Sequence, residues 1–449
     1  MGAHCSYCSK AQLESVQPLG SNGPSKRHLV INMDVNKTIV MSDKVSGKTA
    51  WDVVNEALAS VAWGVAIDDA TWNLQEAVPS SVRPSATADV QKVQTYMEWN
   101  EKRLPGSKNK KERQRLNTTF TERGQPGEAM RHLAHKAVQE LKNPDGSDVG
   151  VLPSFFELLL SLKREKRGFM LFFRTFGEDL ADVADELNEF CEGRHPQFPG
   201  VRMDGSDGEP DYRLSMSSTR KCGTFHRDEN CTSLVMGTTE QPGEGKFKNA
   251  TDRSLQFFKQ FSGLTIISGI NNVQDFFNDK FNHCGTIALR DYFQYWKSKD
   301  MTGDGGKPFF FDPSGRTNRH EIFFDDNIRF DEFHIVQPIN IERPTKKHWV
   351  SQMLQTHLVR SEPWDAIYDR QYFIKNLARL EAGYEGTLKA RERLKALMKN
   401  VMKSKAIVKA FNSSAQEPLK EYDAWKNLRV SDAMLPLKAD DDDQVQRNF

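Results

Sequence analysis

The chain has few cysteines, no long apolar run and almost no net charge among its 449 residues. Its six cysteines are scattered and too few for a disulfide framework in a chain of this length, which indicates a reducing, intracellular compartment. No apolar run reaches the roughly 18 residues of a membrane-spanning helix, and residues 1–28 lack the apolar segment of a secretory signal. The net charge of +1 gives no general attraction to nucleic acid, which is therefore not an expected partner.

The composition is otherwise that of a globular protein. Apolar residues make up 38% of the chain and charged residues 27%, which suits a packed core with a polar surface. The length exceeds that of an average domain, but it is compatible with one large core that carries insertions.

The first residues match a lipidation pattern. Met1 to Ser6 fit the sequence requirement for myristoylation of Gly2, and Cys5 and Cys8 are close enough for S-palmitoylation. Because one myristoyl chain binds membranes only marginally, the cysteines would supply the second anchor. The pattern predicts a cytoplasmic protein that associates with a membrane surface through its N-terminus. The alternative is a tail in which this short pattern occurs by chance.

The most informative segment is an apolar strand near the start of the chain. Leu29 to Met33 form an apolar run, Asp34 ends it, and the polar turn Asn36-Lys37-Thr38 follows. Open α/β sheets bind ligands at the carboxyl ends of their strands, so Asp34 lies where a functional carboxylate is expected. Taken alone, it would be better explained as a turn or helix-capping aspartate.

Three later segments repeat this pattern of an apolar run beside a polar group. They are Phe169–Phe173 before Arg174-Thr175, the Gly306-Lys307-Pro308 turn, and Ile322–Phe324 before Asp325-Asp326. An aspartate, a threonine, a lysine and a pair of acids in this order resemble the four-motif core of the haloacid dehalogenase (HAD) superfamily, most of whose members are magnesium-dependent phosphohydrolases. The resemblance implies an α/β fold, a HAD-like Rossmannoid three-layer sandwich with a parallel central sheet and cap-type insertions.

The resemblance assigns a role to each motif residue. Asp34 would attack phosphorus and form an aspartyl-phosphate, Thr175 would hold a phosphoryl oxygen, and Lys307 would neutralise charge on the nucleophile and the phosphoryl group. Thr175 would also be explained as the cap of the next helix, which is compatible with phosphate binding, and Lys307 as an ordinary loop lysine. The substrate would be a phosphorylated small molecule or protein, whose identity the motifs do not specify.

The same motifs imply one Mg²⁺ ion. Its ligands would be Asp34, the backbone carbonyl of Asn36, and one of the two acids Asp325 and Asp326. Magnesium favours sites with few carboxylates, and two adjacent acids after a buried strand are costly unless a cation or hydrogen-bond donors meet them. The sequence does not distinguish which of the two acids binds the metal directly.

Asn36 is the main departure from the family pattern. Phosphatases of this family usually carry a second aspartate two residues after the nucleophile, which protonates the leaving group and then activates water. Asparagine does not exchange a proton in this way. Three consequences stay open: slow hydrolysis, a substrate with a good leaving group, or binding of phosphate and magnesium without turnover. His226 and Asp228 are candidates to replace the missing acid.

Two functions therefore compete. The leading prediction is a Mg²⁺-dependent phosphohydrolase that acts through an aspartyl-phosphate, which the intact residues Asp34, Thr175 and Lys307 favour. The alternative, which Asn36 favours, is a catalytically weak or inactive HAD-like protein that acts as a membrane-tethered binding or regulatory module.

Shifts in composition divide the chain into a core and its additions. The expected parts are a flexible tail at 1–27, a HAD-like core at 28–46, 150–192 and 263–344, a first cap-type insertion at 47–149, a second insertion at 193–262, a helical extension at 345–430 and an acidic tail at 431–449. Apolar spacing predicts helices over 50–62, 153–167, 180–190 and about 289–296, and a helical region over 345–410 that is broken near Gly383. The remaining strands are expected at 264–267, 309–311, 321–324 and 333–336, where they would complete the sheet.

The first insertion carries a basic stretch. Its cations are Lys102, Arg103, Lys108, Lys110, Lys111, Arg113 and Arg115. The stretch is better explained as a solvated helix face than as a contact surface for nucleic acid, acidic lipid or a phosphorylated substrate.

Overall fold

The computed structural model describes residues 26–41, 47–84, 93–344 and 346–411, with side chains described as far as Met402. Its internal contacts divide the chain into two compact units, Met1–Leu388 and Lys389–Phe449. Some expectations lie outside the described residues, namely the acylation pattern at Gly2, Cys5 and Cys8, nearly all of the tail at 1–27 and the acidic tail at 431–449. Among the helices that the structure describes, none is long and apolar enough to cross a membrane.

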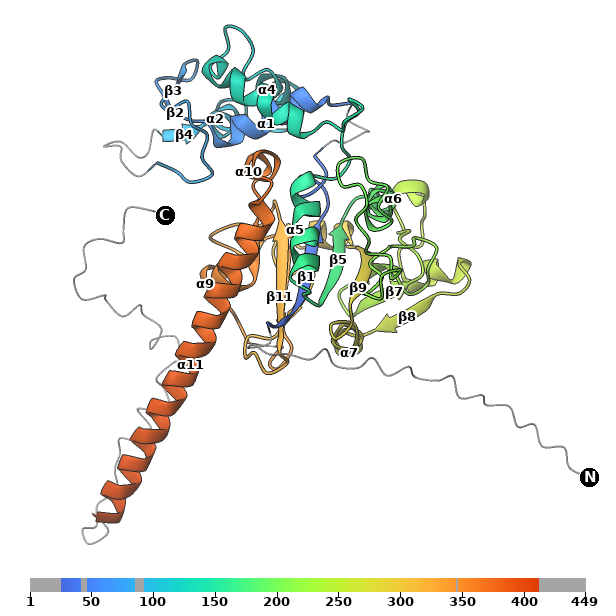
Figure 1. Cartoon of the computed structure of the whole chain (residues 1–449), viewed down its shortest axis with the longest axis vertical. Coiled ribbons are helices and arrows are strands. Elements are labelled where there is room, and N and C mark those ends of the chain that lie inside the picture. Colours follow the sequence, from blue (N-terminus) through green and yellow to red (C-terminus); the bar gives the residue numbers. More distant parts are fainter. Residues whose placement is uncertain (1–25, 42–46, 85–92, 345, 412–449) are drawn as a thin grey trace, which may run out of the picture. The chain divides into compact units, whose positions relative to one another are not determined.

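The first unit is a mixed α/β structure around a mostly parallel eight-stranded sheet (Figure 1). In spatial order its strands are β13 (Leu358–Arg360), β11 (Arg319–Asp325), β1 (His28–Asp34), β5 (Phe169–Thr175), β9 (Gly285–Arg290), β6 (Cys222–Arg227), β7 (Thr232–Met236) and β8 (Thr265–Ser268). Neighbours from β13 to β6 pair in parallel, whereas β7 and β8 are antiparallel additions at one edge. The parallel part confirms the expected sheet type.

The central strands are buried because they are covered on both faces. All seven residues of β5 are buried, and so are six of the seven in β1, as expected for near-continuous apolar runs in a parallel sheet. The register aligns Asp34 with Arg174 on β5 and Met33 with Phe324 on β11. The three strands therefore end at the same level, which brings their C-terminal residues to one edge of the sheet.

Helices and a small second sheet cover the two faces. Alternate residues of β1 pack into two different apolar clusters, Leu29 and Ile31 into one and Val30 into the other. The first cluster receives α5 (Pro153–Arg164), α6 (Leu180–Cys191), α10 (Pro363–Tyr368) and the start of α11 (Tyr372–Phe411). The second receives α7 (Ile270–Lys280) and the two-stranded parallel sheet of β10 (Lys307–Phe311) and β12 (Val336–Asn340). A third cluster involves α8 (Phe293–Ser298) and α9 (Val350–Thr356).

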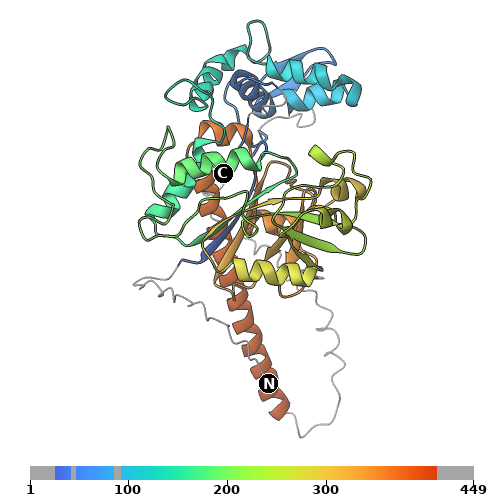
Figure 2. The same ribbon diagram turned by 90° about the vertical axis from the view of Figure 1, so that its right-hand side faces the viewer.

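The described residues of the first insertion, 47–84 and 93–149, form helices beside a short sheet of their own, coloured from blue through cyan to teal at the top of Figure 2. The sheet has the antiparallel order β3 (Trp72–Leu74), β2 (Trp63–Ala66) and β4 (Val93–Thr95). The helices are α1 (Ala50–Val61), α2 (Tyr96–Arg103), α3 (Lys110–Thr118) and α4 (Arg131–Glu140), with 3-10 turns η1 (Ser107–Asn109) and η2 (Glu128–Met130). Capping boxes begin α1 at Thr49 and α2 at Thr95. Both α1 and α4 contact α10.

The segment 193–262 differs from the expectation of a separate insertion. It contributes β6 and β7 to the central sheet, and otherwise contains only irregular chain and the 3-10 turns η3 (Gly245–Phe247) and η4 (Leu255–Gln260) among its named elements. The run at 264–267 also differs, because β8 is an antiparallel edge strand with largely exposed side chains. Ile266 is exposed and Ile267 packs only at the margin of the second cluster, since an apolar run identifies a strand but not its neighbours.

Three other expectations require correction. The helix expected at 289–296 is the end of β9 followed by the short α8, an error typical of a brief apolar run. The runs expected at 309–311 and 333–336 do not complete the central sheet, because β10 and β12 pair with each other. Finally, α11 continues through Gly383. A Cβ atom at this glycine would lie 2.1 Å from the carbonyl oxygen of Gln355, so close packing explains the glycine rather than a break.

Candidate active site

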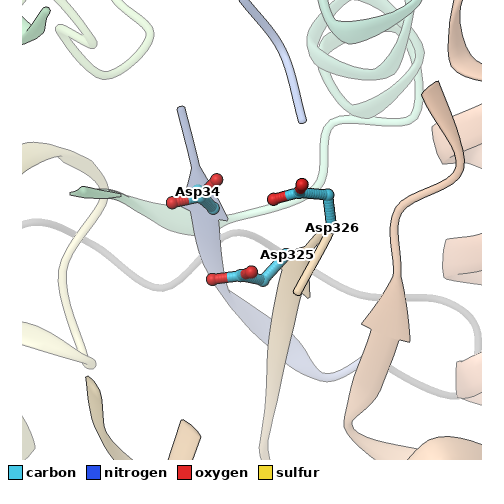
Figure 3. A group of neighbouring side chains, drawn as sticks. All are labelled: Asp34, Asp325 and Asp326. Atoms are coloured by element: carbon cyan, nitrogen blue, oxygen red, sulfur yellow. The ribbon is translucent and has the colours of Figure 1, made fainter. Parts of the chain in front are cut away.

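Four acidic or hydroxyl side chains meet at the carboxyl edge of the central sheet. Asp34, Thr175 and Asp325 are the last residues of β1, β5 and β11, and Asp326 follows directly. One carboxylate oxygen from each of Asp34, Asp325 and Asp326 lies within 4.8 Å of the others. Figure 3 shows these three carboxylates turned toward a common space. Residues separated by almost three hundred positions in the sequence thus form one cluster.

Lys307 joins this cluster from β10. Its Nζ donates to Oδ1 of Asp34 and, over 2.8 Å, to Oδ2 of Asp325. The lysine side chain is 2% exposed, and Asp325 is completely buried. Lys307 was expected in a turn, but it is the first residue of a strand, so the backbone of β10 determines where its side chain begins. It is a buried ammonium group between two carboxylates, and the interpretation as an ordinary loop lysine is wrong.

The cluster contains three carboxyl groups and one ammonium group. Burial raises the pKa of Asp34 well above its usual value; the charge of Lys307 acts against this shift, and the neighbouring carboxylates Asp325 and Asp326 add to it. Burial and the charge of Asp325 raise the pKa of Asp326 to about 7. Burial disfavours the charged form of Lys307, but Asp325 and Asp34 outweigh this effect and raise its pKa. Additional positive charge at this point would be stabilised.

Thr38 is a site residue that the sequence did not predict. Its hydroxyl donates to Oδ2 of Asp34 over 3.2 Å and accepts from the backbone N–H of Asp326 over 3.2 Å. The preceding Lys37 has a φ of 61°, a left-handed conformation that turns the chain sharply after β1. The hydroxyl therefore fixes one oxygen of Asp34 and links the ends of β1 and β11. Its place in the polar turn directly after Asp34 was the available signal.

A buried ion pair between Arg174 and Asp291 lies next to the cluster and positions Lys307. Arg174 donates through Nε and Nη2 to both oxygens of Asp291, over 2.9 and 2.6 Å, and both side chains are 1% exposed. Its Nη1 donates to the carbonyl of Pro308 over 2.9 Å. The carbonyl of Arg174 accepts from Lys307 Nζ over 3.5 Å. Arg174 thereby holds the start of β10, and with it Lys307, against β5.

Asn36 and Asp179 form a pair next to Thr175. The amide Nδ2 of Asn36 donates to Oδ2 of Asp179 over 2.8 Å. Both atoms lie 2.7 Å from the point where a Cβ atom on Gly177 would stand, and the Thr175 hydroxyl lies 3.3 Å from that point. The Thr175 hydroxyl also accepts from the N–H of Gly177 over 2.8 Å. Asp179 is partly exposed and precedes α6, where its position alone indicates only a helix cap.

The structure does not bring the other proposed acids to this cluster. His226 lies on β6, which β9 and β5 separate from β1, a distance of about 14 Å at the usual strand spacing. Its Nε2 is 2.8 Å from the carbonyl of Arg253. Asp228 accepts from the N–H groups of Asn230 and Cys231 in the turn after β6. Neither residue replaces an acid at position 36.

The donors at the cluster suit a hard divalent cation. Three carboxylates face one another with a single buried ammonium group in contact, and magnesium prefers oxygen donors of this kind. Asp325 already accepts from Lys307 and from the N–H of Asn327, whereas Asp326 accepts from the Asn327 side chain. The carbonyl of Asn36 as a further ligand stays a prediction.

Comparisons with protein-family models, with curated proteins and with solved structures found no match to this chain.

Proposed function

We propose that the chain is a HAD-like phosphohydrolase that uses Mg²⁺ and forms an aspartyl-phosphate on Asp34. The observation that carries the proposal is the convergence of Asp34, Lys307 and Asp325 in one buried, hydrogen-bonded cluster beside Thr175. These groups come from four separate segments, and their joint position at the carboxyl edge of a parallel sheet is where such folds bind ligands. The residues that carried the sequence resemblance are therefore also neighbours in space.

The chemistry has two steps. A carboxylate oxygen of Asp34 attacks phosphorus, and the bond to the leaving oxygen breaks with its electron pair on that oxygen. Water then attacks the phosphorus of the aspartyl-phosphate, and the bond to Asp34 breaks to return the carboxylate. Thr38 and Lys307 orient the Asp34 oxygens, and the Thr175 hydroxyl binds a phosphoryl oxygen. A magnesium ion held by Asp34 with Asp325 or Asp326 would neutralise charge on the phosphoryl group.

Asp179 is the carboxylate that serves in place of the missing aspartate. Asn36 holds it through a hydrogen bond on the side of the cluster where the Thr175 hydroxyl lies. In this role Asp179 takes the proton of the attacking water in the second step. The asparagine then positions an acid instead of acting as one. This role would explain why Asn36 stands where phosphatases of this family usually have an aspartate.

A binding or regulatory protein without turnover is the second candidate, and one observation favours it. Asn36 occupies the family's acid position and its side chain is already engaged by Asp179, so no acid stands at position 36 itself. Phosphate release from the wild type and from Asn36→Asp separates the two functions. A large gain in Asn36→Asp would indicate a working site that is limited by its acid, whereas no release from either protein would favour the binding protein.

Phosphate release from a panel of substrates tests the proposal. The panel contains an aryl phosphate, an acyl phosphate, nucleotides and sugar phosphates, each with magnesium or with a chelator. Asp34→Asn is the matched variant, because it keeps the size of the side chain and removes the nucleophile. The proposal expects release that requires both magnesium and Asp34. Release that is equal in the wild type and Asp34→Asn on every substrate would reject it.

A further inference from the structure

The second half of α11 carries large apolar side chains that are exposed. Leu397, Met398, Val401 and Met402 are 62%, 60%, 46% and 59% exposed, although the first turns of the same helix bury Phe373 and Leu380 completely. Every residue from 395 to 402 is exposed. Isolated exposed apolar residues are ordinary, but four within six positions form a patch that calls for an explanation.

These residues form one stripe along the helix. With Leu394 they follow the spacing i, i+3, i+4, i+7 and i+8 of an amphipathic helix. We call Leu394, Leu397, Met398, Val401 and Met402 the apolar stripe. At about 100° per residue the stripe covers an arc of about 140°. The arc is wide enough for one side of the helix to lie on an apolar surface while the other side stays in water.

Basic residues surround the apolar stripe. Residues 389–402 contain five cations, Lys389, Arg391, Arg393, Lys395 and Lys399, and a single acid, Glu392. Arg393 and Lys395 project at about 90–110° from the centre of the stripe, one on each border. Because the whole chain has a net charge of only +1, this concentration of positive charge is local. A surface that covers the stripe must therefore accept positive charge at its margin.

We propose that this part of α11 lies on an anionic phospholipid surface, with the apolar stripe at the boundary between headgroups and acyl chains. A basic amphipathic helix of this kind binds membranes through buried apolar area together with attraction to acidic lipids. Long cations at the borders keep their charges at headgroup level while their stems cover apolar surface. The inference is independent of the proposed phosphohydrolase activity.

Charge and length argue against the other occupants. Two copies of this helix would bring like charges together. A coiled coil also needs at least three or four heptads, whereas the stripe spans about two and a half turns of the part of α11 whose side chains the structure describes. A protein groove that enclosed the helix would also cover Lys389 and Lys399, which project about 150° and 130° from the centre of the stripe. The acylation pattern at Gly2 fits the membrane, because one acyl chain needs a second signal such as a basic patch.

Sedimentation with lipid vesicles tests the proposal on the full-length protein made without acylation. The probes are vesicles of phosphatidylcholine alone and vesicles with about one third phosphatidylserine. Variant Leu397→Gln/Met398→Gln removes half of the exposed stripe, and Lys395→Gln/Lys399→Gln removes two charges. The matched control is Lys110→Gln/Lys111→Gln, which makes the same charge change at exposed positions of α3.

The wild type is expected to bind the phosphatidylserine vesicles and to bind phosphatidylcholine vesicles much less. Loss of two charges in α11 should weaken binding about 20- to 30-fold, and the same loss in α3 should leave it unchanged. The stripe variant should lose binding while keeping the thermal midpoint of the wild type, since its substitutions lie on exposed positions.

Three results would overturn the proposal. The first is equal binding by the wild type and both α11 variants, and the second is equal loss in the α3 control. The third is a wild-type protein that does not bind anionic vesicles. It would instead form a dimer, or bind a protein with an acidic groove, and Leu397→Gln/Met398→Gln would abolish that association. Each of these results would show that the apolar stripe and its cations do not bind the membrane.

Discussion

Replacing Lys307 by methionine should lower the thermal stability of the protein, because Lys307 is the counter-charge of the buried carboxylates. The ammonium group contacts Asp34 and Asp325 where the three side chains are between 0% and 7% exposed, so Lys307→Met leaves buried carboxylates without their counter-charge. Removing one partner from a buried ion pair typically costs about 3–5 kcal/mol. In a unit of this size that cost lowers the thermal midpoint by roughly 4–6 °C.

The control is a lysine that also contacts carboxylate oxygens but at the surface. Lys299 donates to both oxygens of Glu229, over 2.9 and 2.7 Å, and Glu229 is 70% exposed. Lys299→Met should therefore leave the thermal midpoint almost unchanged, because solvent screens an exposed ion pair. The assay is thermal unfolding followed by circular dichroism, with a chelator and then with magnesium, which should restore part of the loss in Lys307→Met alone. Equal midpoints for the two variants would refute the account of Lys307 as the counter-charge of the cluster.

Three further predictions test other parts of the account. Asp179→Asn is expected to lower phosphate release by about 10²–10⁴-fold and the exchange Asn36→Asp/Asp179→Asn to restore it; full activity in the single variant would exclude Asp179 as the proton acceptor. Arg174→Met should cost about 3–5 kcal/mol in thermal unfolding because it strands a buried carboxylate, and an unchanged midpoint would contradict that. Burial raises the pKa of Glu362 to about 7 from its ordinary 4.5. Between pH 4.5 and pH 7 the folded state therefore binds more protons than the unfolded state. The free energy of unfolding then falls by roughly 3 kcal/mol as the pH rises across this range. Glu362→Gln should therefore be more stable than the wild type at pH 8 and equal to it at pH 4, and parallel pH curves would count against this reasoning.

The sequence located the cluster because its residues follow apolar strands. Asp34, Thr175 and Asp325 each end a run that is buried from one end to the other, and period and composition are enough to recognise such runs. Lys307 was correctly identified as a site residue but was expected in a turn, and it is the first residue of a strand. A lysine at the start of a strand and a lysine in a turn can have the same local sequence. The position of a side chain depends on which strand its own strand pairs with, and local sequence does not contain that information.

Other parts of the site depend on contacts between distant segments. Arg174 and Asp291 are 117 positions apart, and either one alone would be placed on the surface. Asp179 is only four residues after Thr175, but its position before a helix is explained by capping, which concealed its contact with Asn36. In the same way, nothing in the composition of residues 222–236 distinguishes two strands of the central sheet from the hairpin of an insertion.

Direct detection of phosphate on Asp34 tests the central claim most closely. The protein is incubated with magnesium and an acyl or aryl phosphate, quenched, and reduced with borohydride, which converts an aspartyl-phosphate to homoserine that peptide mass spectrometry identifies. The account predicts homoserine at position 34, and a larger amount of it in Asp179→Asn because the second step is slowed. Substrate turnover with no modification at Asp34 in either protein would contradict it.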